Sequence, residues 1–177
     1  MVSRRPGGKA FPRLNSLVVL SWCNYLLVAM GWVEALYAYP RLPGQMSIWL
    51  NVFGHEIPRA DKSLLFFIYP LAQSLCVLGG MWFFRVRRAP KPTAESVPSS
   101  ASAETEARIR ARKTEHLLLT LIFVNLIFIH LQTSLILLAH RISTGVNEVY
   151  FASLFVVILA LIPYYRIREK MILQRRL

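Results

Sequence analysis

Two ionisable residues with clear chemical potential lie inside long apolar runs of the sequence. Glu34 is the only acidic residue within such a run, and His130 lies near the middle of another. A carboxylate in hydrocarbon is costly and points by default to a function, such as ligand binding or proton transfer. Glu34 lies about one turn from the end of its run, so an ion pair or contact with water is the simpler interpretation. The basic side chains near that end are Arg41, Lys62, His140 and Arg141.

His130 has two interpretations. A mid-membrane imidazole can ligate haem or a chlorophyll-type pigment, or relay protons. No second His lies within an apolar run, and His116, at the edge of this one, would lie about 20 Å away along a helix, so the two cannot share one haem. A hydrogen bond to another helix is therefore favoured. We expect no bound cofactor, with haem or pigment at His130 as the alternative.

Amide side chains form a second polar set within the apolar runs. Asn125 and Gln132 are seven residues apart and share one face of a helix. Amides in membrane helices hydrogen-bond to neighbouring helices and contribute about 0.6 kcal/mol each. Asn24, Gln73 and Ser74 are the expected partners, so these residues are predicted to hold helices together.

The sequence lacks the signatures of common enzymes and metal sites. Cys23 and Cys76 are the only cysteines, and no Cys/His spacing suggests zinc. They are expected to be packing residues, not a disulfide. No nucleophile elbow, phosphate-binding loop or dinucleotide fingerprint occurs. The expected class is non-enzymatic.

The elements that must position these residues are four apolar runs. They cover Leu14–Ala38, Leu64–Phe84, Leu117–Ala139 and Val149–Tyr165. About 20 apolar residues cross a hydrocarbon core of roughly 30 Å, and only helices or closed barrels satisfy their backbone there. The chain is 55% hydrophobic with a mean hydropathy of +0.43. We therefore predict an all-α polytopic membrane protein with four transmembrane helices in two hairpins.

The distribution of positive charge predicts the orientation. Of 21 Lys and Arg residues, 17 lie before the first run, between the second and third, or after the fourth. By the positive-inside rule, both termini and the central connection are cytoplasmic. The net charge of +12 is then explained by topology and anionic headgroups on the cytoplasmic side, and no nucleic-acid partner is expected.

Composition divides the chain into three parts. Residues 1–88 form a first transmembrane hairpin with an outer loop at 39–63. Residues 89–113 form a cytoplasmic linker, rich in Pro, Ser and Ala at its start and in good helix formers from about Glu104. Residues 114–177 form a second hairpin with a basic C-terminal tail, in which Asn147 and Glu148 are expected to start the last helix.

The outer loop resembles the membrane family known as domain of unknown function 1648, a domain also found in Sdp toxin immunity proteins. Its family pattern is Leu-Pro, then Ile-Pro-x-His-aromatic-Asn, then Gly, and a Lys that opens the next span. The matching positions, at ungapped spacing, are Leu42, Pro43, Asn51, Gly54 and Lys62. The chain departs from the pattern at Trp49, where the family has His, and at Ser47, where it has Pro.

The resemblance implies a non-enzymatic role in envelope immunity or signalling through this loop. Trp49, with the five matching residues, would then recognise an extracellular partner. The simpler interpretation is a cap folded over the end of the bundle, since Pro43 fixes φ and aromatic residues settle at the headgroup level. The alternative function is a small accessory subunit of a larger membrane complex, with His130 near a bound cofactor. The expected partners are membrane lipids and either another membrane protein or a second copy of this chain.

Overall fold

The computed structural model describes residues 13–46, 60–87, 100–143 and 145–174. Its long elements are the helices α1 (Arg13–Ala38), α2 (Ile68–Arg87), α3 (Ser100–Ala139) and α4 (Glu148–Gln174). Two short 3-10 helices, η1 (Tyr39–Arg41) and η2 (Leu64–Phe67), flank the first connection. This connection also contains the strands β1 (Gln45–Met46) and β2 (Ala60–Asp61).

The predicted all-α architecture with four long apolar helices is confirmed. Each of the four helices is long and apolar enough to cross a membrane, which indicates a multi-pass membrane protein. The candidate spans are Ser16–Arg41, Leu64–Phe83, Glu106–Ala139 and Glu148–Ile172. Their outward faces carry large apolar side chains, as lipid contact requires.

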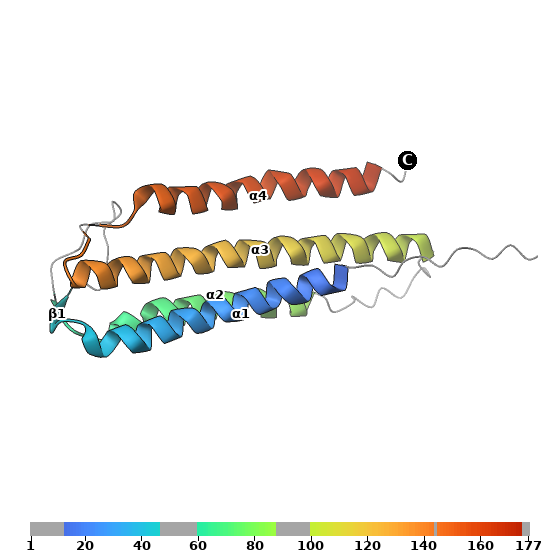
Figure 1. Cartoon of the computed structure of the whole chain (residues 1–177). Coiled ribbons are helices and arrows are strands. Elements are labelled where there is room, and N and C mark those ends of the chain that lie inside the picture. Colours follow the sequence, from blue (N-terminus) through green and yellow to red (C-terminus); the bar gives the residue numbers. More distant parts are fainter. Residues whose placement is uncertain (1–12, 47–59, 88–99, 144, 175–177) are drawn as a thin grey trace, which may run out of the picture.

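Helix α3 is the centre of the bundle. Figure 1 shows α1 and α2 along one side of α3 and α4 along the other. The most extensive packing joins α1 to α3, and α1 contacts its sequence neighbour α2 less extensively. The pair with the most extensive packing, α1 and α3, is thus not consecutive in the chain. Helix α3 contacts α1 and α2 as well as α4.

Helix α4 is attached to α3 at three places. The rings of Tyr150 and His130 lie 4.6 Å apart near one end of α4. Leu154, four residues after Tyr150, is buried. Near the other end the rings of His116 and Tyr165 stack at 4.6 Å. An exposed ion pair there joins Lys113 Nζ to Glu169 Oε1 at 3.3 Å. Most of the remaining α4 surface is exposed.

The structure refines the limits of two helices. Helix α3 is already helical at Ser100, within the segment assigned to a linker, because Ala, Glu and Arg favour helix there. An ion pair between Arg110 and Glu106 at 2.8 Å supports this part of the helix. The predicted start of α4 is confirmed: Asn147 Oδ1 accepts a hydrogen bond from the Tyr150 backbone N–H at 3.0 Å. Pro163 lies inside α4 without ending it.

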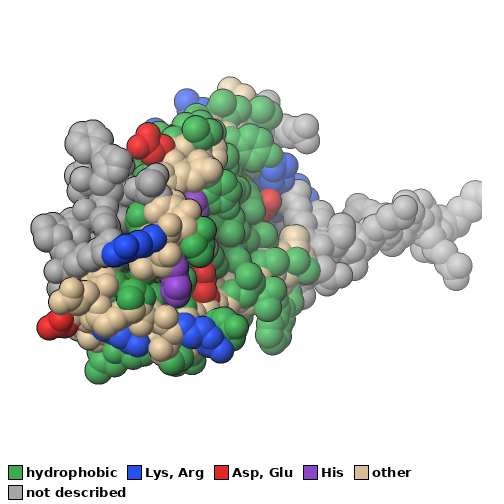
Figure 2. All heavy atoms as spheres, turned by 60° about the vertical axis from the view of Figure 1, so that its left-hand side comes forward, with side chains coloured by type: hydrophobic (Ala, Val, Ile, Leu, Met, Phe, Trp, Pro, Cys, Tyr) green, Lys and Arg blue, Asp and Glu red, His purple; other side chains and the backbone are tan. Residues whose placement is uncertain are grey.

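The end of the bundle away from the termini carries the two strands. Gln45 pairs with Asp61 and Met46 pairs with Ala60 in an antiparallel register. Two-residue strands give no sequence signal, so this pairing was not predicted. Figure 2 views the molecule toward this end, where charged and His side chains gather, while apolar side chains cover much of the visible flank.

Candidate functional site

A buried amide pair joins α1 to α3. Asn125 Nδ2 donates to Asn24 Oδ1 at 2.9 Å, and both residues are fully buried. Asn24 Nδ2 in turn donates to the backbone oxygens of Leu20, at 2.9 Å, and Leu118, at 3.0 Å. The expected contact between these two amides is confirmed. Asn24 thus has all its partners within the bundle, whereas the buried Oδ1 of Asn125 has no hydrogen-bond partner among the described residues.

A second polar contact joins α1 to α2. Gln73 is buried, and its Nε2 donates to the Leu27 oxygen at 3.1 Å. A Cβ on Gly31 would meet the Oε1 of Gln73, so a larger residue at this position of α1 would displace the amide end of this flexible side chain. Trp32 Nε1 also donates to Ser74 Oγ at 2.9 Å. Gly31 is therefore a positioning residue that the sequence analysis missed.

Glu34 is held by neutral donors from α3. Thr133 Oγ1 donates to Glu34 Oε1 at 2.5 Å, and Gln132 Nε2 donates to Glu34 Oε2 at 3.1 Å. Gln132 is buried and also donates to the Gly31 oxygen at 3.0 Å. Among the described residues, no ion pair to Glu34 occurs, so the proposed pairing with Arg41, Lys62, His140 or Arg141 is replaced by these hydrogen bonds. Thr133, unlike Gln132, was not anticipated.

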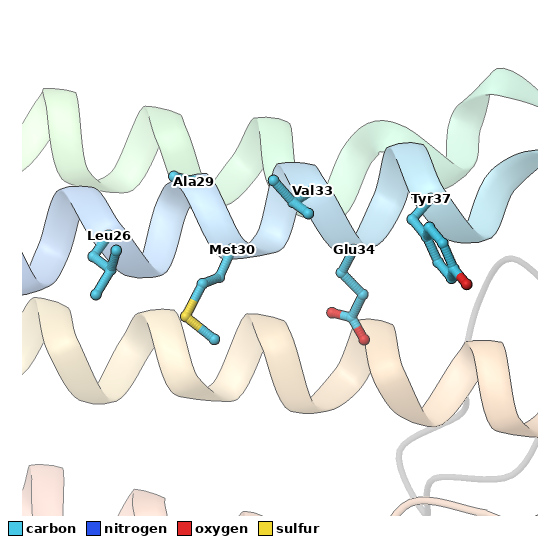
Figure 3. A pocket seen from close by; sticks show the side chains of 6 residues that line it. All are labelled: Leu26, Ala29, Met30, Val33, Glu34 and Tyr37. Atoms are coloured by element: carbon cyan, nitrogen blue, oxygen red, sulfur yellow. The ribbon is translucent and has the colours of Figure 1, made fainter.

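A groove of about 410 Å³ runs along α1 beside Glu34. Its lining is apolar apart from the Glu34 carboxylate and the Tyr37 hydroxyl. Figure 3 shows Met30 and Glu34 pointing from α1 toward α3. The lining residues are Leu26, Ala29, Met30, Val33, Glu34 and Tyr37. The groove thus combines an acyl-like environment with one acidic group.

His130 lies at the α3–α4 contact, away from this groove. Its Nε2 is buried and has no hydrogen-bond partner among the described residues, and its ring contacts that of Tyr150. The expected hydrogen bond to another helix is thus not formed by Nε2. Within the described residues, no group of three or more His, Cys, Asp or Glu side chains could hold a metal ion.

The described part of the outer loop is packed onto the bundle. Leu42, Met46 and Phe66 form a buried cluster with Ala35. Lys62 closes the loop: its backbone N–H donates to the Gly44 oxygen at 2.7 Å, and its Nζ lies 4.6 Å from the centre of the Tyr39 ring. Pro43, the residue that follows Leu42, is partly buried. The other predicted recognition residues, Trp49, Asn51 and Gly54, lie outside the described residues.

The two cysteines are free thiols. Cys23 is partly buried, whereas Cys76 is exposed on the outward face of α2, so the predicted packing role is wrong for Cys76. An apolar environment on the lipid side satisfies a thiol as well as a core does, which is why composition did not separate the two. No protein-family model, no curated protein and no solved structure matches this chain.

Proposed function

We propose that this chain is a non-enzymatic bacterial inner-membrane protein that meets an extracellular partner through the outer loop, residues 39–63. Its role would be envelope immunity or signalling, as the resemblance of this loop to the domain 1648 family implies. Both termini and the connection between α2 and α3 would be cytoplasmic, on the basis of the positive-inside rule.

The observation that carries this proposal is the anchoring of both ends of the loop. The strands β1 and β2 bring Met46 and Ala60 together, and the cluster of Leu42, Met46 and Phe66 seats them on α1. The tilted rings of Tyr39 and Phe67, with centroids 4.9 Å apart, extend this cluster. A preorganised base reduces the entropy lost on binding, which is what a recognition loop requires.

The interhelical polar contacts support a protein that acts without a permanent partner. Asn24, Gln73, Asn125 and Gln132 are all buried within the chain's own bundle. An accessory subunit would be expected to offer some of its polar span residues to a neighbouring protein.

The second candidate, an accessory subunit of a larger complex, is favoured by one observation. Helix α4 packs on α3 and keeps large apolar side chains exposed along its length, such as Val156 and Leu159. Either lipid or a partner helix can cover such a face.

Purification of the full chain in a mild detergent, followed by native mass analysis, separates the two candidates. A monomer or homo-oligomer supports the first. A stoichiometric foreign subunit supports the second.

The role of the loop is tested by site-specific photo-crosslinking in cells. A photoreactive residue at Trp49 is expected to give a discrete protein adduct, and one at Leu78, exposed on α2, serves as the lipid-facing control. The same adducts from both positions, or none from Trp49, would contradict recognition by the loop.

A further inference from the structure

Arg141, just past the end of α3, has a backbone conformation that arginine rarely adopts. Its φ is 58°, and among the described residues other than glycine it alone has a positive φ. Its N–H donates to the Leu138 oxygen at 3.0 Å, and the N–H of Ile142 donates to the Leu137 oxygen at 2.9 Å. This pair of bonds commonly ends a helix with glycine at the position of Arg141, where a side chain adds strain.

The side chain of Arg141 makes no contact within the protein that would offset this strain. Arg141 is exposed, and within the described part of the chain its guanidinium forms no hydrogen bond, ion pair or ring contact. The exposed acids that the structure describes at this end, Asp61 and Glu148, are not paired with it. Arg41 and Lys62, by contrast, each lie over a tyrosine ring. A strained residue with a free cationic side chain points to a role toward another molecule.

Arg141 lies beside the base of the outer loop. Ile136 and Ala139, in the last turn of α3, pack against the cluster that seats the loop. None of residues 114–139 is exposed, because α3 lies between the other helices (Figure 1). The end of such an enclosed helix faces the water beyond the bundle, not the acyl chains. Ile142, at 73% exposure, adds an apolar side chain next to the guanidinium.

We propose that Arg141 and Ile142 belong to the surface that meets the extracellular partner, and that the partner presents an acidic segment to them. This inference rests on the proposed function and specifies the chemistry of the partner. A guanidinium binds a carboxylate through two parallel hydrogen bonds, and apolar contacts around such a pair exclude water from it. Arginine is among the residues that contribute most to binding at protein interfaces.

The chemistry is tested by photo-crosslinking of the full-length protein in nanodiscs of phosphatidylcholine, a lipid without net charge. A photoreactive residue at Ile142 reports only molecules that lie next to Arg141. The probe is a short peptide of Glu, Leu and Gly, compared with the same peptide in which Gln replaces each Glu. The acidic peptide is expected to give about ten times more adduct, the worth of one charge-assisted contact, and Arg141→Gly should bring this ratio close to one.

The matched control is Arg166→Gln, which removes an exposed arginine near the other end of the molecule. It is expected to keep the ratio. A ratio near one with Arg141 in place, or an equal fall in both variants, would overturn the proposal. In nanodiscs that also contain phosphatidylglycerol, an adduct to this lipid in place of the peptide would assign Arg141 to an anionic headgroup and would overturn it too.

Unfolding of Arg141→Gly in mixed micelles separates recognition from a structural role. Glycine suits a positive φ, so the variant is expected to be no less stable than the wild type. A cation that acted only on the dipole at the end of α3 would make the variant less stable. A clear loss of stability would therefore contradict the proposal.

Photo-crosslinking in cells separates this inference from the function on which it rests. The positions of Trp49 and Ile142 are expected to give adducts to the same protein, and the Ile142 adduct should be lost in Arg141→Gly. An adduct from Trp49 alone would leave the proposed function standing and overturn the role of Arg141. An adduct from Ile142 alone would support Arg141 and count against recognition by the loop, and no protein adduct from either position would contradict both.

Discussion

The two sides of α3 are held by different kinds of contact. On one side, α1 and α2 are joined to each other and to α3 by buried amides, a close-approach glycine and a fully buried Leu135. On the other side, α4 is held by ring contacts, the buried Leu154 and Tyr165, a hydrogen bond between the Tyr165 and Glu115 side chains, and an exposed ion pair. Buried polar side chains fix the register between two membrane helices, because lipid offers no hydrogen-bond partner to an amide that loses its contact. We therefore infer that α1, α2 and α3 form the rigid unit and that α4 is the more easily separated helix.

The largest effect should come from filling the space next to Gly31. Gly31→Leu would force Gln73 out of its place and separate α1 from α2, which is expected to cost about 3 kcal/mol of unfolding free energy. Gly79→Leu is the matched control, since a Cβ at Gly79 meets nothing within 4 Å. Reversible unfolding in mixed micelles would measure both. Equal losses would show that Gly31 has no special role.

Leucine truncations compare the two sides of α3 directly. Leu135→Ala, at 0% exposure on α3, is expected to cost about 2 kcal/mol, and Leu154→Ala, at 7% exposure on α4, about 1 kcal/mol. Leu159→Ala, on the exposed face of α4, should change the free energy of unfolding little. The same unfolding assay checks this order. A greater loss at Leu154 than at Leu135 would reverse our assignment of the rigid unit.

A double-mutant cycle isolates the amide pair. Asn24→Ala and Asn125→Ala are each expected to destabilise the protein by about 1 kcal/mol, with a coupling energy of about 0.6 kcal/mol, because each leaves a buried amide with one partner fewer. Additive losses would contradict a direct interaction between the two side chains.

The smallest effect is expected at the outer loop. Lys62→Met removes the cation over the Tyr39 ring and the 3.4 Å contact from Nζ to the Leu42 oxygen but keeps the backbone bond to Gly44. The expected cost is about 0.5 kcal/mol. Lys62→Arg, which preserves the charge, should recover most of it. A cost well above that of the Asn24 variant would make this residue a main support of the bundle.

The sequence identified the interhelical polar contacts that are made by amide side chains inside the apolar runs. Asn125 and Gln132 share a helical face, as their seven-residue spacing predicted, and both reach α1. The other expected partners, Gln73 and Ser74, bond to α1 instead. Gly31 and Thr133 could not be chosen in this way, because glycines and threonines are common in membrane helices for many reasons. His130 was predicted to hydrogen-bond to another helix, but only the position of α4 reveals that Tyr150 meets its ring instead.

The sequence by itself determined the number and class of the long apolar helices, since hydrocarbon thickness and backbone hydrogen bonding leave no other choice for four apolar runs. Only the tertiary structure decided that α3 lies between the other helices, that Glu34 is held by neutral donors, and that an apolar groove lies beside this residue on α1. The reason is physical: lipid is as apolar as the side chains it contacts, so hydropathy places a residue in the membrane without saying which neighbour it faces.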